Sequence, residues 1–230
     1  MNRGKTAFIL THEDKATSNI FAMAKNYHAN VPDAMRPSTK ASNANEMVFD
    51  RLGSRYAVGT ARTTGTGRSF TVHYFHGSEA AFWQNAADHL AGLGQTVPDM
   101  PGTEVIIEST ANGIGNTFHS MVMSGIRGEG DYRVIFVPWY WQEEYCRPVP
   151  DGFGLDADEQ AYAEAYNLSL AQMAWRRAKI STDFQGDVAL FDQEYPASIG
   201  LAFRASTLGS YIEIDPVERA MRTTVEPQNE

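Results

Sequence analysis

The amino-acid sequence predicts an α/β protein with a mostly parallel sheet and a carboxyl-terminal helical region. Short apolar runs alternate with segments of helical periodicity as far as residue 137. Strands that alternate with helices pair in parallel, with helices on both faces of the sheet. From residue 138 onward only helical patterns remain. The sequence contains no internal repeat and no low-complexity block.

The elements of the first part follow from apolar periodicity and from the turn residues between them. Short runs of apolar and β-branched residues predict strands, and apolar side chains three and four residues apart predict helices. Thr11 is expected to cap the first helix, because acidic residues follow it. The expected elements are strand 7–11, helix 13–27, strands 47–49 and 56–58 joined around Gly53, strand 70–75, helix 80–93, strand 104–108, helix 116–126 and strand 132–137.

The second part is expected to be helical. Helices are predicted at 156–166, 170–180 and 188–195. Asp156 and Ser169 have side chains that can cap the first two of them. The final residues form a polar tail.

Composition indicates an ordinary globular chain with an uneven charge. The 230 residues are 43% hydrophobic and 20% charged, which is enough to bury a substantial core. The net charge of −9 argues against a general nucleic-acid-binding protein. Residues 1–68, however, hold ten Lys and Arg against five Asp and Glu, and the remainder holds nine against twenty-three. If DNA binds this chain, the amino-terminal third is the side that its charge favours, but charge alone favours a solvated basic face.

Nothing in the sequence predicts a membrane protein or a secreted one. The longest apolar stretch, 134–141, is far shorter than a membrane span. The single cysteine, Cys146, cannot form an internal disulfide, which fits a reducing compartment. We therefore expect a cytoplasmic protein without a membrane partner.

Polar residues follow two of the predicted strands. One set is His76-Gly-Ser-Glu79, and the other is Glu108-Ser-Thr-Ala-Asn-Gly113. Ligands of parallel α/β sheets bind at the carboxyl ends of the strands, where nucleotide hydrolases place a water-activating carboxylate. Glu79 is the candidate base. Acids after strands are also common helix caps, and the pattern alone favours a cap.

Five sequence blocks together resemble the ATPase part of the large terminase subunits of tailed bacteriophages. They occur in the order of that family and extend over about residues 5 to 210. The blocks are Phe75-His-Gly-Ser-Glu-Ala-Ala-Phe-Trp83, Val105-Ile-Ile-Glu-Ser-Thr-Ala-Asn-Gly113, Phe136-Val-Pro-Trp-Tyr-Trp-Gln-Glu-Glu-Tyr145, Ala174-Trp-Arg-Arg-Ala-Lys179 and Phe191-Asp-Gln-Glu-Tyr-Pro196.

The resemblance implies a sheet of the P-loop NTPase (ASCE) type and a motor that pumps viral DNA into a preformed capsid. The cofactors that it implies are ATP and Mg²⁺. The partners are double-stranded DNA, the portal protein and the terminase small subunit, in a ring homo-oligomer on the procapsid. The location is the cytoplasm of the bacterial host.

The resemblance also implies roles for particular residues. Glu79 corresponds to the Walker B acid that activates water, and Ser78 stands where the family usually has a magnesium-binding acid. Ser78 and Glu79 thus mark the expected magnesium neighbourhood, with one carboxylate fewer than usual. Arg68 corresponds to an arginine finger, with Arg62 as the second choice and a solvated loop arginine as the alternative. The coupling motif corresponds to Ser109, Thr110, Ala111, Asn112 and Gly113.

The phosphate-binding loop of this family, Walker A, is absent from the sequence. The loop requires G-x-x-x-x-G-K-[ST] between a strand and a helix. Gly4-Lys5-Thr6 matches the end of the pattern, but the upstream glycine would fall before Met1, and a strand is predicted directly after it. We therefore expect a partial ATPase, whose nucleotide-binding residues are unknown and which hydrolyses little or no ATP alone.

The resemblance divides the chain into three parts. These are a partial ATPase core at 1–137, a helical lid or linker region at 138–205, and the start of a linker toward a nuclease domain at 206–230. Two other functions remain open. One is a non-catalytic module that binds DNA or packaging subunits, and the other is a degraded prophage remnant.

Overall fold

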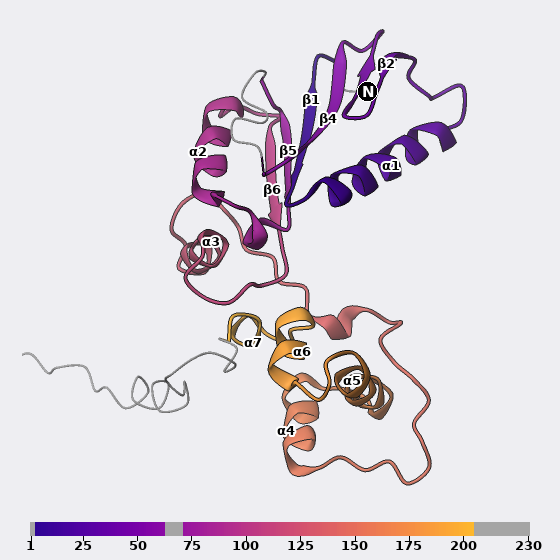
Figure 1. Ribbon diagram of the computed structural model, residues 1–230, viewed down its shortest axis with the longest axis vertical. Coiled ribbons are helices and arrows are strands. Elements are labelled where there is room, and N and C mark those ends of the chain that lie inside the picture. Colours follow the sequence, from indigo (N-terminus) through magenta and orange to yellow (C-terminus); the bar gives the residue numbers. More distant parts are fainter. Residues whose placement is uncertain (1–2, 63–70, 205–230) are drawn as a thin grey trace, which may run out of the picture. The chain divides into compact units, whose positions relative to one another are not determined.

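A computed structural model describes residues 3–62 and 71–204 (Figure 1). The chain forms two compact units, residues 1–110 and residues 111–230. We call them the strand unit and the helical unit, and each is described by itself. The sequence-based division at residues 137 and 205 stays a prediction, because compactness does not define a functional boundary.

The strand unit is built on a mixed, mostly parallel sheet, as predicted. Its described strands lie in the order β2-β3-β4-β1-β5-β6. Strands β4, β1, β5 and β6 run parallel, whereas β3 is antiparallel to both β2 and β4. The bounds are β1 (Thr6–Thr11), β2 (Thr39–Ser42), β3 (Glu46–Phe49), β4 (Ser54–Thr60), β5 (Tyr74–Ser78) and β6 (Glu104–Glu108).

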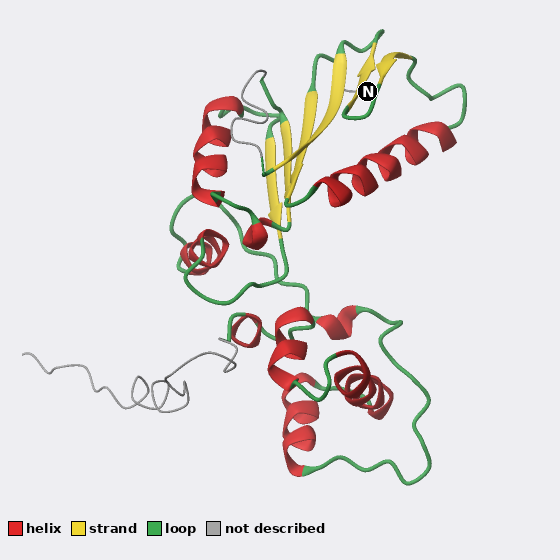
Figure 2. Cartoon of the chain, viewed as in Figure 1, coloured by secondary structure: helices red, strands yellow, loops and turns green. Residues whose placement is uncertain are grey.

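Helices cover both faces of this sheet. They are α1 (Asp14–Asn30), the 3-10 helix η1 (Ala80–Phe82) and α2 (Ala86–Thr96), and α1 and α2 lie on opposite sides of the strands (Figure 2). Phe21 of α1 packs against Ile9, Met47 and Val58 in a buried cluster. Burying such side chains contributes about 1.5–3 kcal/mol each.

Three predictions about the strand unit need correction. The strand predicted at 70–75 is β5, which begins at Tyr74 and ends at Ser78, and residue 70 lies outside the described residues. The helix predicted at 80–93 is divided into η1 and α2, because Asn85 has a left-handed backbone with φ 54°. Thr11 does not cap α1. The helix starts from Glu13, and the fully buried Thr11 hydroxyl instead hydrogen-bonds Thr17 at 2.5 Å.

The helical unit is organised around aromatic side chains. Trp139 and Phe191 are buried in its core, and Trp175 stacks on Trp139 with ring centroids 5.2 Å apart. Asp156 and Ser169 form capping boxes at the starts of α4 and α5, which confirms their predicted role. The helices are α3 (Thr117–Ile126), the 3-10 helix η2 (Trp139–Trp141), α4 (Ala157–Tyr166), α5 (Leu170–Asp183), α6 (Val188–Glu194) and α7 (Ile199–Ala202).

The strand predicted at 132–137 is not formed. Ile135 is 78% exposed and Val137 is 65% exposed. The run is apolar enough for a buried strand, but a strand requires hydrogen-bonded neighbours, and no described residue pairs with this segment. Within the described ranges, no helix is long and apolar enough to cross a membrane.

Gly77 permits the close packing at the end of β5. A Cβ atom at this position would lie 2.7 Å from the Trp83 ring, which is closer than van der Waals contact allows. The Trp83 indole N–H in turn donates to the Ser78 carbonyl oxygen at 2.9 Å. Trp83 therefore lies directly over β5 where the strand ends.

We expect Gly77→Ala to lower the free energy of unfolding by about 1–3 kcal/mol, because the added methyl group displaces Trp83. The matched control is Gly94→Ala in α2, where the added carbon would meet nothing within 4 Å. The control should raise stability by about 0.5–1 kcal/mol, because alanine favours a helix. Urea unfolding followed by Trp fluorescence measures both. Equal effects of the two substitutions would contradict the packing role.

Candidate active site at the strand ends

The candidate site lies where β5 and β6 end side by side. The two strands are parallel, and their register pairs Ser78 with Glu108. The residues that follow, Glu79 and Ser109, therefore leave the same edge of the sheet. This is the carboxyl edge at which ligands of α/β sheets bind.

Glu79 and Ser109 are joined by a hydrogen bond. The Ser109 hydroxyl donates to Glu79 Oε2 at 3.2 Å, and its oxygen accepts from the backbone N–H of Ala81 at 3.2 Å. Glu79 itself has a left-handed backbone, with φ 56° and ψ 46°. For a residue with a side chain this conformation costs on the order of 1 kcal/mol, and such strain is typical of functional sites. The half-buried Glu79 carboxylate is thus held by its turn and by Ser109.

Glu108 forms a second carboxylate at this edge. Its Oε1 lies 3.2 Å from His76 Nε2, between neighbouring strands. Burial alone would raise the pKa of Glu108, but hydrogen bonds from His76, Ser78 and the Glu79 backbone outweigh it and hold the pKa below its usual value. Glu108 therefore favours the ionised state and ties the Ser78–Glu79 turn to β6.

The other predicted site residues are the two candidate arginines and the rest of the coupling motif. Arg62 is exposed in the turn after β4, next to Ala61, whose carbonyl oxygen lies 2.6 Å from His89 Nε2. Arg68 lies outside the described residues. Within the coupling motif, Thr110 is half-buried, Ala111 is buried against Phe203, Asn112 is exposed, and Gly113 has a left-handed backbone with φ 65°.

Sequence reasoning missed a hydroxyl network at the ends of β1 and β4. Thr17 Oγ1 lies 2.5 Å from Thr11 Oγ1 and 3.1 Å from Thr60 Oγ1. The Thr60 hydroxyl donates to Asp14 Oδ1 at 2.6 Å. Sequence reasoning also assigned no role to Glu108. In both cases the sequence shows a polar residue at the end of an apolar strand. The hydrogen-bond partner of that residue, however, comes from a distant segment of the chain.

The oxygen atoms at this edge could hold a magnesium ion only if water or phosphate oxygens supplied its other ligands. Magnesium commonly binds through one or two carboxylates and completes its shell with water and phosphate oxygens. Ser78 and Glu79 could supply such ligands, directly or through water. No group of three or more His, Cys, Asp or Glu side chains that could hold a metal occurs within the described part of the chain.

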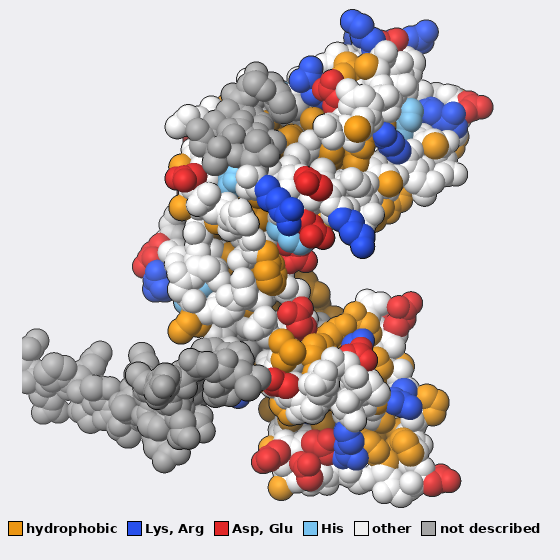
Figure 3. Space-filling model, in the orientation of Figure 1, with side chains coloured by type: hydrophobic (Ala, Val, Ile, Leu, Met, Phe, Trp, Pro, Cys, Tyr) orange, Lys and Arg blue, Asp and Glu red, His pale blue; other side chains and the backbone are white. Residues whose placement is uncertain are grey.

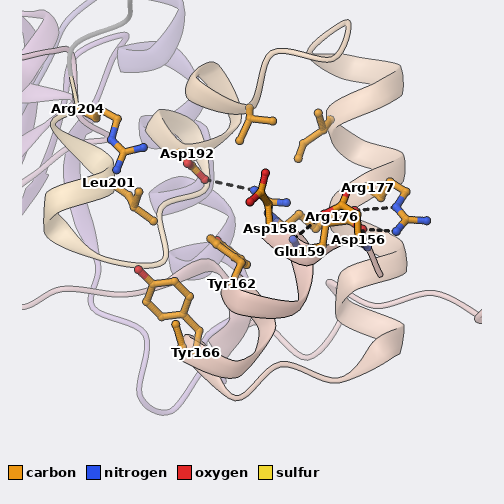
Figure 4. A pocket seen from close by; sticks show the side chains of 13 residues that line it. Asp156, Asp158, Glu159, Tyr162, Tyr166, Arg176, Arg177, Asp192, Leu201 and Arg204 are labelled. Atoms are coloured by element: carbon orange, nitrogen blue, oxygen red, sulfur yellow. Dashed lines mark hydrogen bonds and ion pairs between the residues drawn. The ribbon is translucent and has the colours of Figure 1, made fainter. Parts of the chain in front are cut away.

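A separate pocket of about 570 Å³ lies in the helical unit (Figure 4). At its wall, Arg176 NH2 and Asp192 Oδ1 form a buried ion pair at 3.8 Å, and burial raises the pKa of Asp192. Its charged lining residues are Asp156, Asp158, Glu159, Asp192, Arg176, Arg177 and Arg204. Because acids outnumber arginines there, the pocket has no net attraction for phosphate, and we assign no nucleotide to it.

Lys and Arg side chains are visible over the strand unit on the face shown in Figure 3, together with acidic ones. Exposed Lys and Arg residues of this unit lie in α1 and in the β2–β4 region. On the face shown in Figure 3, the described part of the strand unit carries mixed charge rather than a single positive patch. DNA binding there stays a prediction.

Comparisons with known proteins show the fold. No protein-family model matches the sequence, and no curated protein is similar to it. The large terminase of bacteriophage HK97 aligns with a TM-score of 0.55 at 13% identity, over 95% of this chain and 43% of that one. This chain thus spans less than half the length of that protein.

Two further large terminases give weaker likenesses. One, from a thermophilic bacteriophage, has a TM-score of 0.45 at 10% identity, over 75% of this chain and 40% of its own. The ATPase domain of the Thermus phage P74-26 large terminase has a TM-score of 0.42 at 16% identity, over 85% of this chain and 77% of its own. The HK97 likeness alone carries the conclusion that the chain has a large-terminase-like fold, as the sequence predicted.

We expect Glu108→Gln to reduce the loss of stability in acid. The folded-state pKa of Glu108 lies below its ordinary 4.5, so its ionised form stabilises the fold. That contribution is complete above the unfolded-state pKa and disappears as the pH falls through the folded-state pKa. The urea midpoint should therefore fall less between pH 7 and about pH 3 in Glu108→Gln than in the wild type.

The control for this experiment is Glu104→Gln. Glu104 lies on the same strand and the same face, and its side chain has no hydrogen bond or ion pair with a described residue. The control should follow the wild-type pH dependence. If Glu108→Gln and Glu104→Gln behave alike, the interactions assigned to Glu108 do not stabilise the folded state.

Proposed function

We propose that this chain forms the part of a DNA-packaging ATPase, of the large-terminase type, that activates water and couples hydrolysis to DNA movement. The observation that carries the proposal is the hydrogen bond between Glu79 and Ser109 at adjoining strand ends. It joins the residue that the resemblance assigns to water activation with the first residue of the coupling motif. The HK97-like fold supports the same assignment.

In this proposal Glu79 is the general base. Its carboxylate accepts a proton from the water that attacks the γ-phosphate of ATP, which is a role that typically accelerates a reaction by about 10²–10⁴-fold. The left-handed turn and the Ser109 hydroxyl fix the direction of the carboxylate. Glu108, bonded to the same turn, keeps Ser78 and the Glu79 backbone in place.

Ser109 and Thr110 would transmit the loss of the γ-phosphate. When the phosphate leaves, a shift of Glu79 changes its hydrogen bond to Ser109. The chain passes from the strand unit to the helical unit between Thr110 and Ala111, within the coupling motif. A displacement of Ser109 would therefore move the chain segment that connects the two units.

ATP, Mg²⁺ and the remaining motor parts belong to the proposal as partners. When bound, Mg²⁺ would neutralise phosphate charge, with Ser78 and Glu79 as its nearest protein groups. Arg68 or Arg62 of a neighbouring subunit would stabilise charge in the transition state. Double-stranded DNA, the portal protein and the small terminase subunit complete the proposed assembly, a ring on the capsid precursor.

Joining the phosphate-loop segment of the HK97 large terminase to the amino terminus of this chain should give magnesium-dependent ATP hydrolysis. The 230-residue chain alone should hydrolyse little or no ATP, because its sequence contains no G-x-x-x-x-G-K-[ST] motif. In the chimera, Glu79→Gln should lower kcat by about 10²–10⁴-fold. Ser109→Ala should lower it by about tenfold, which corresponds to one hydrogen bond. Phosphate release measures each rate.

Glu104→Gln in the same chimera is the control and should leave the rate unchanged. Robust hydrolysis by the 230-residue chain that Glu79→Ala abolishes would contradict the expected inactivity of the chain alone, but it would agree with the role of Glu79. A chimera that folds cooperatively and hydrolyses ATP equally well with and without Glu79 would contradict the proposal.

The uneven charge favours one alternative, a module that binds DNA without hydrolysis. In that case the chain should bind duplex DNA with an affinity that falls as salt rises, and Arg62→Ala with Arg68→Ala should weaken binding and reduce the salt dependence. Lys179→Ala, a substitution in the helical unit, is the control. Fluorescence anisotropy at several salt concentrations measures the affinity, and the absence of ATP binding at millimolar concentration would separate this module from the enzyme.

A further inference from the structure

The peptide group that leads into Glu79 is held at both ends by side chains. Its carbonyl oxygen, which belongs to Ser78, accepts from the Trp83 indole N–H at 2.9 Å. Its N–H, which belongs to Glu79, donates to the Glu108 carboxylate. Because a peptide group is planar, these two bonds fix the plane from which Glu79 turns into its left-handed conformation, with φ 56°. The direction of the Glu79 carboxylate therefore depends on the position of Trp83.

Trp83 packs between β5 and a buried histidine to which the proposed function assigns no role. On the β5 side its ring lies against Gly77 and meets Phe75 edge-on, with ring centroids 6.5 Å apart. On the α2 side it meets His89, with ring centroids 6.0 Å apart and an interplanar angle of 77°. Trp83 is 6% exposed and His89 is 9% exposed. The indole is thus confined by the strand below it and by the His89 ring.

The His89 ring is itself oriented by the end of β4. Its Nε2 lies 2.6 Å from the carbonyl oxygen of Ala61, the residue that follows β4. A carbonyl oxygen only accepts hydrogen bonds, so Nε2 carries a proton and donates. Ala61 is a rigid acceptor, because it is buried and its N–H donates to the Thr11 carbonyl oxygen at 2.8 Å. This hydrogen bond therefore fixes the orientation of the buried ring.

We propose that His89 is a positioning residue for Glu79 and acts on it through Trp83. The inference rests on the proposed function, because it concerns the carboxylate that activates water. Ala61 orients the His89 ring, and the ring holds the Trp83 indole in place. The indole N–H then fixes the Ser78 carbonyl oxygen and with it the turn at Glu79. The alternative is a core histidine that stabilises the fold and has no effect on Glu79.

Two matched substitutions separate these roles. In His89→Gln the side-chain amide reaches about as far as Nε2 and keeps a donor for Ala61, whereas the shorter amide of His89→Asn reaches only about as far as Nδ1. The two variants therefore differ mainly in the hydrogen bond to Ala61. In the unsubstituted chain, ring ¹⁵N chemical shifts should show His89 protonated at Nε2. A neutral ring protonated only at Nδ1 would overturn the proposal without any substitution.

Amide hydrogen exchange, measured by NMR on the full chain, reports on the Glu79 turn without ATP. In His89→Asn the Glu79 amide should exchange about tenfold faster than in the wild type, because its peptide group is freer to rotate away from Glu108. In His89→Gln it should exchange at the wild-type rate. The Phe8 amide in β1 is the reference, since a general loss of stability would accelerate both amides. Equal acceleration of both amides, or of neither, would overturn the proposal.

His73 provides a control at the amino ends of the strands. Its Nδ1 accepts from the backbone N–H of Thr6 at 3.2 Å, where β1 begins. In His73→Gln the longer side chain places no acceptor at that point, so the variant loses a hydrogen bond of the same kind. Its stability should fall, but exchange at Glu79 should stay at the wild-type rate relative to Phe8.

The ATP-hydrolysing chimera tests whether this positioning affects the reaction. His89→Asn should lower kcat by about tenfold and leave the KM for ATP unchanged, because the carboxylate acts in the transition state and not in ATP binding. In a Glu79→Gln background the same substitution should have no further effect, since no base remains to be positioned. His89→Gln and His73→Gln should retain the wild-type kcat. A purely structural His89 would lower kcat by the same factor in both backgrounds.

Failure of this inference and failure of the proposed function give different results. A chimera whose hydrolysis depends on Glu79 but not on His89 would overturn the inference and leave the proposed function intact. A chimera that hydrolyses no ATP would count against the proposed function, and exchange at Glu79 would then decide the role of His89. If His89→Asn does not fold, Trp83→Phe replaces it. This variant keeps a ring over β5 but removes the indole N–H, so it should also accelerate exchange at Glu79, and an unchanged rate would overturn the proposal.

Discussion

The parallel register of β5 and β6 is the constraint on which the candidate site depends. It pairs Ser78 with Glu108, so the next residues of the two strands, Glu79 and Ser109, come within hydrogen-bonding distance. A slip of one residue would turn every side chain of one strand to the opposite face and would separate them. Trp83 stabilises the end of β5, because it packs on Gly77 and donates to the Ser78 carbonyl. The geometry of the site is thus determined largely by backbone pairing and by one tryptophan.

Local patterns predicted much of the fold because most of its elements have strong local signals. The strand at 104–108 is observed with its predicted bounds, and Asp156 and Ser169 begin helices as expected. The failures have non-local causes. Thr11 resembles a helix cap, but tertiary contact with Thr17 uses its hydroxyl. The break at Asn85 depends on a left-handed conformation that the helical composition of 80–93 does not indicate.

The candidate site was predictable in its residue types but not in its contacts. Glu79 and Ser109 could each be identified from a polar residue after an apolar strand. Their hydrogen bond requires the strands that precede them to be neighbours, and sequence spacing does not determine strand order. The same limit explains why Glu108 received no role. Its bonds to His76 and Ser78 cross from β6 to β5, and they become visible only once the register is known.

Two departures from expectation have one physical cause, a shortage of hydrogen-bonding neighbours for strand-forming sequences. The segment 132–137 has the composition of a buried strand, yet Ile135 and Val137 remain largely exposed. β6 does form, because β5 supplies one neighbour, but no described strand pairs with its other side, and Ile106 is 51% exposed. A single neighbour is enough to establish a strand and too little to bury it. Apolar composition therefore indicates that a segment can form a strand, but hydrogen-bonding neighbours decide whether the strand forms and how far it is buried.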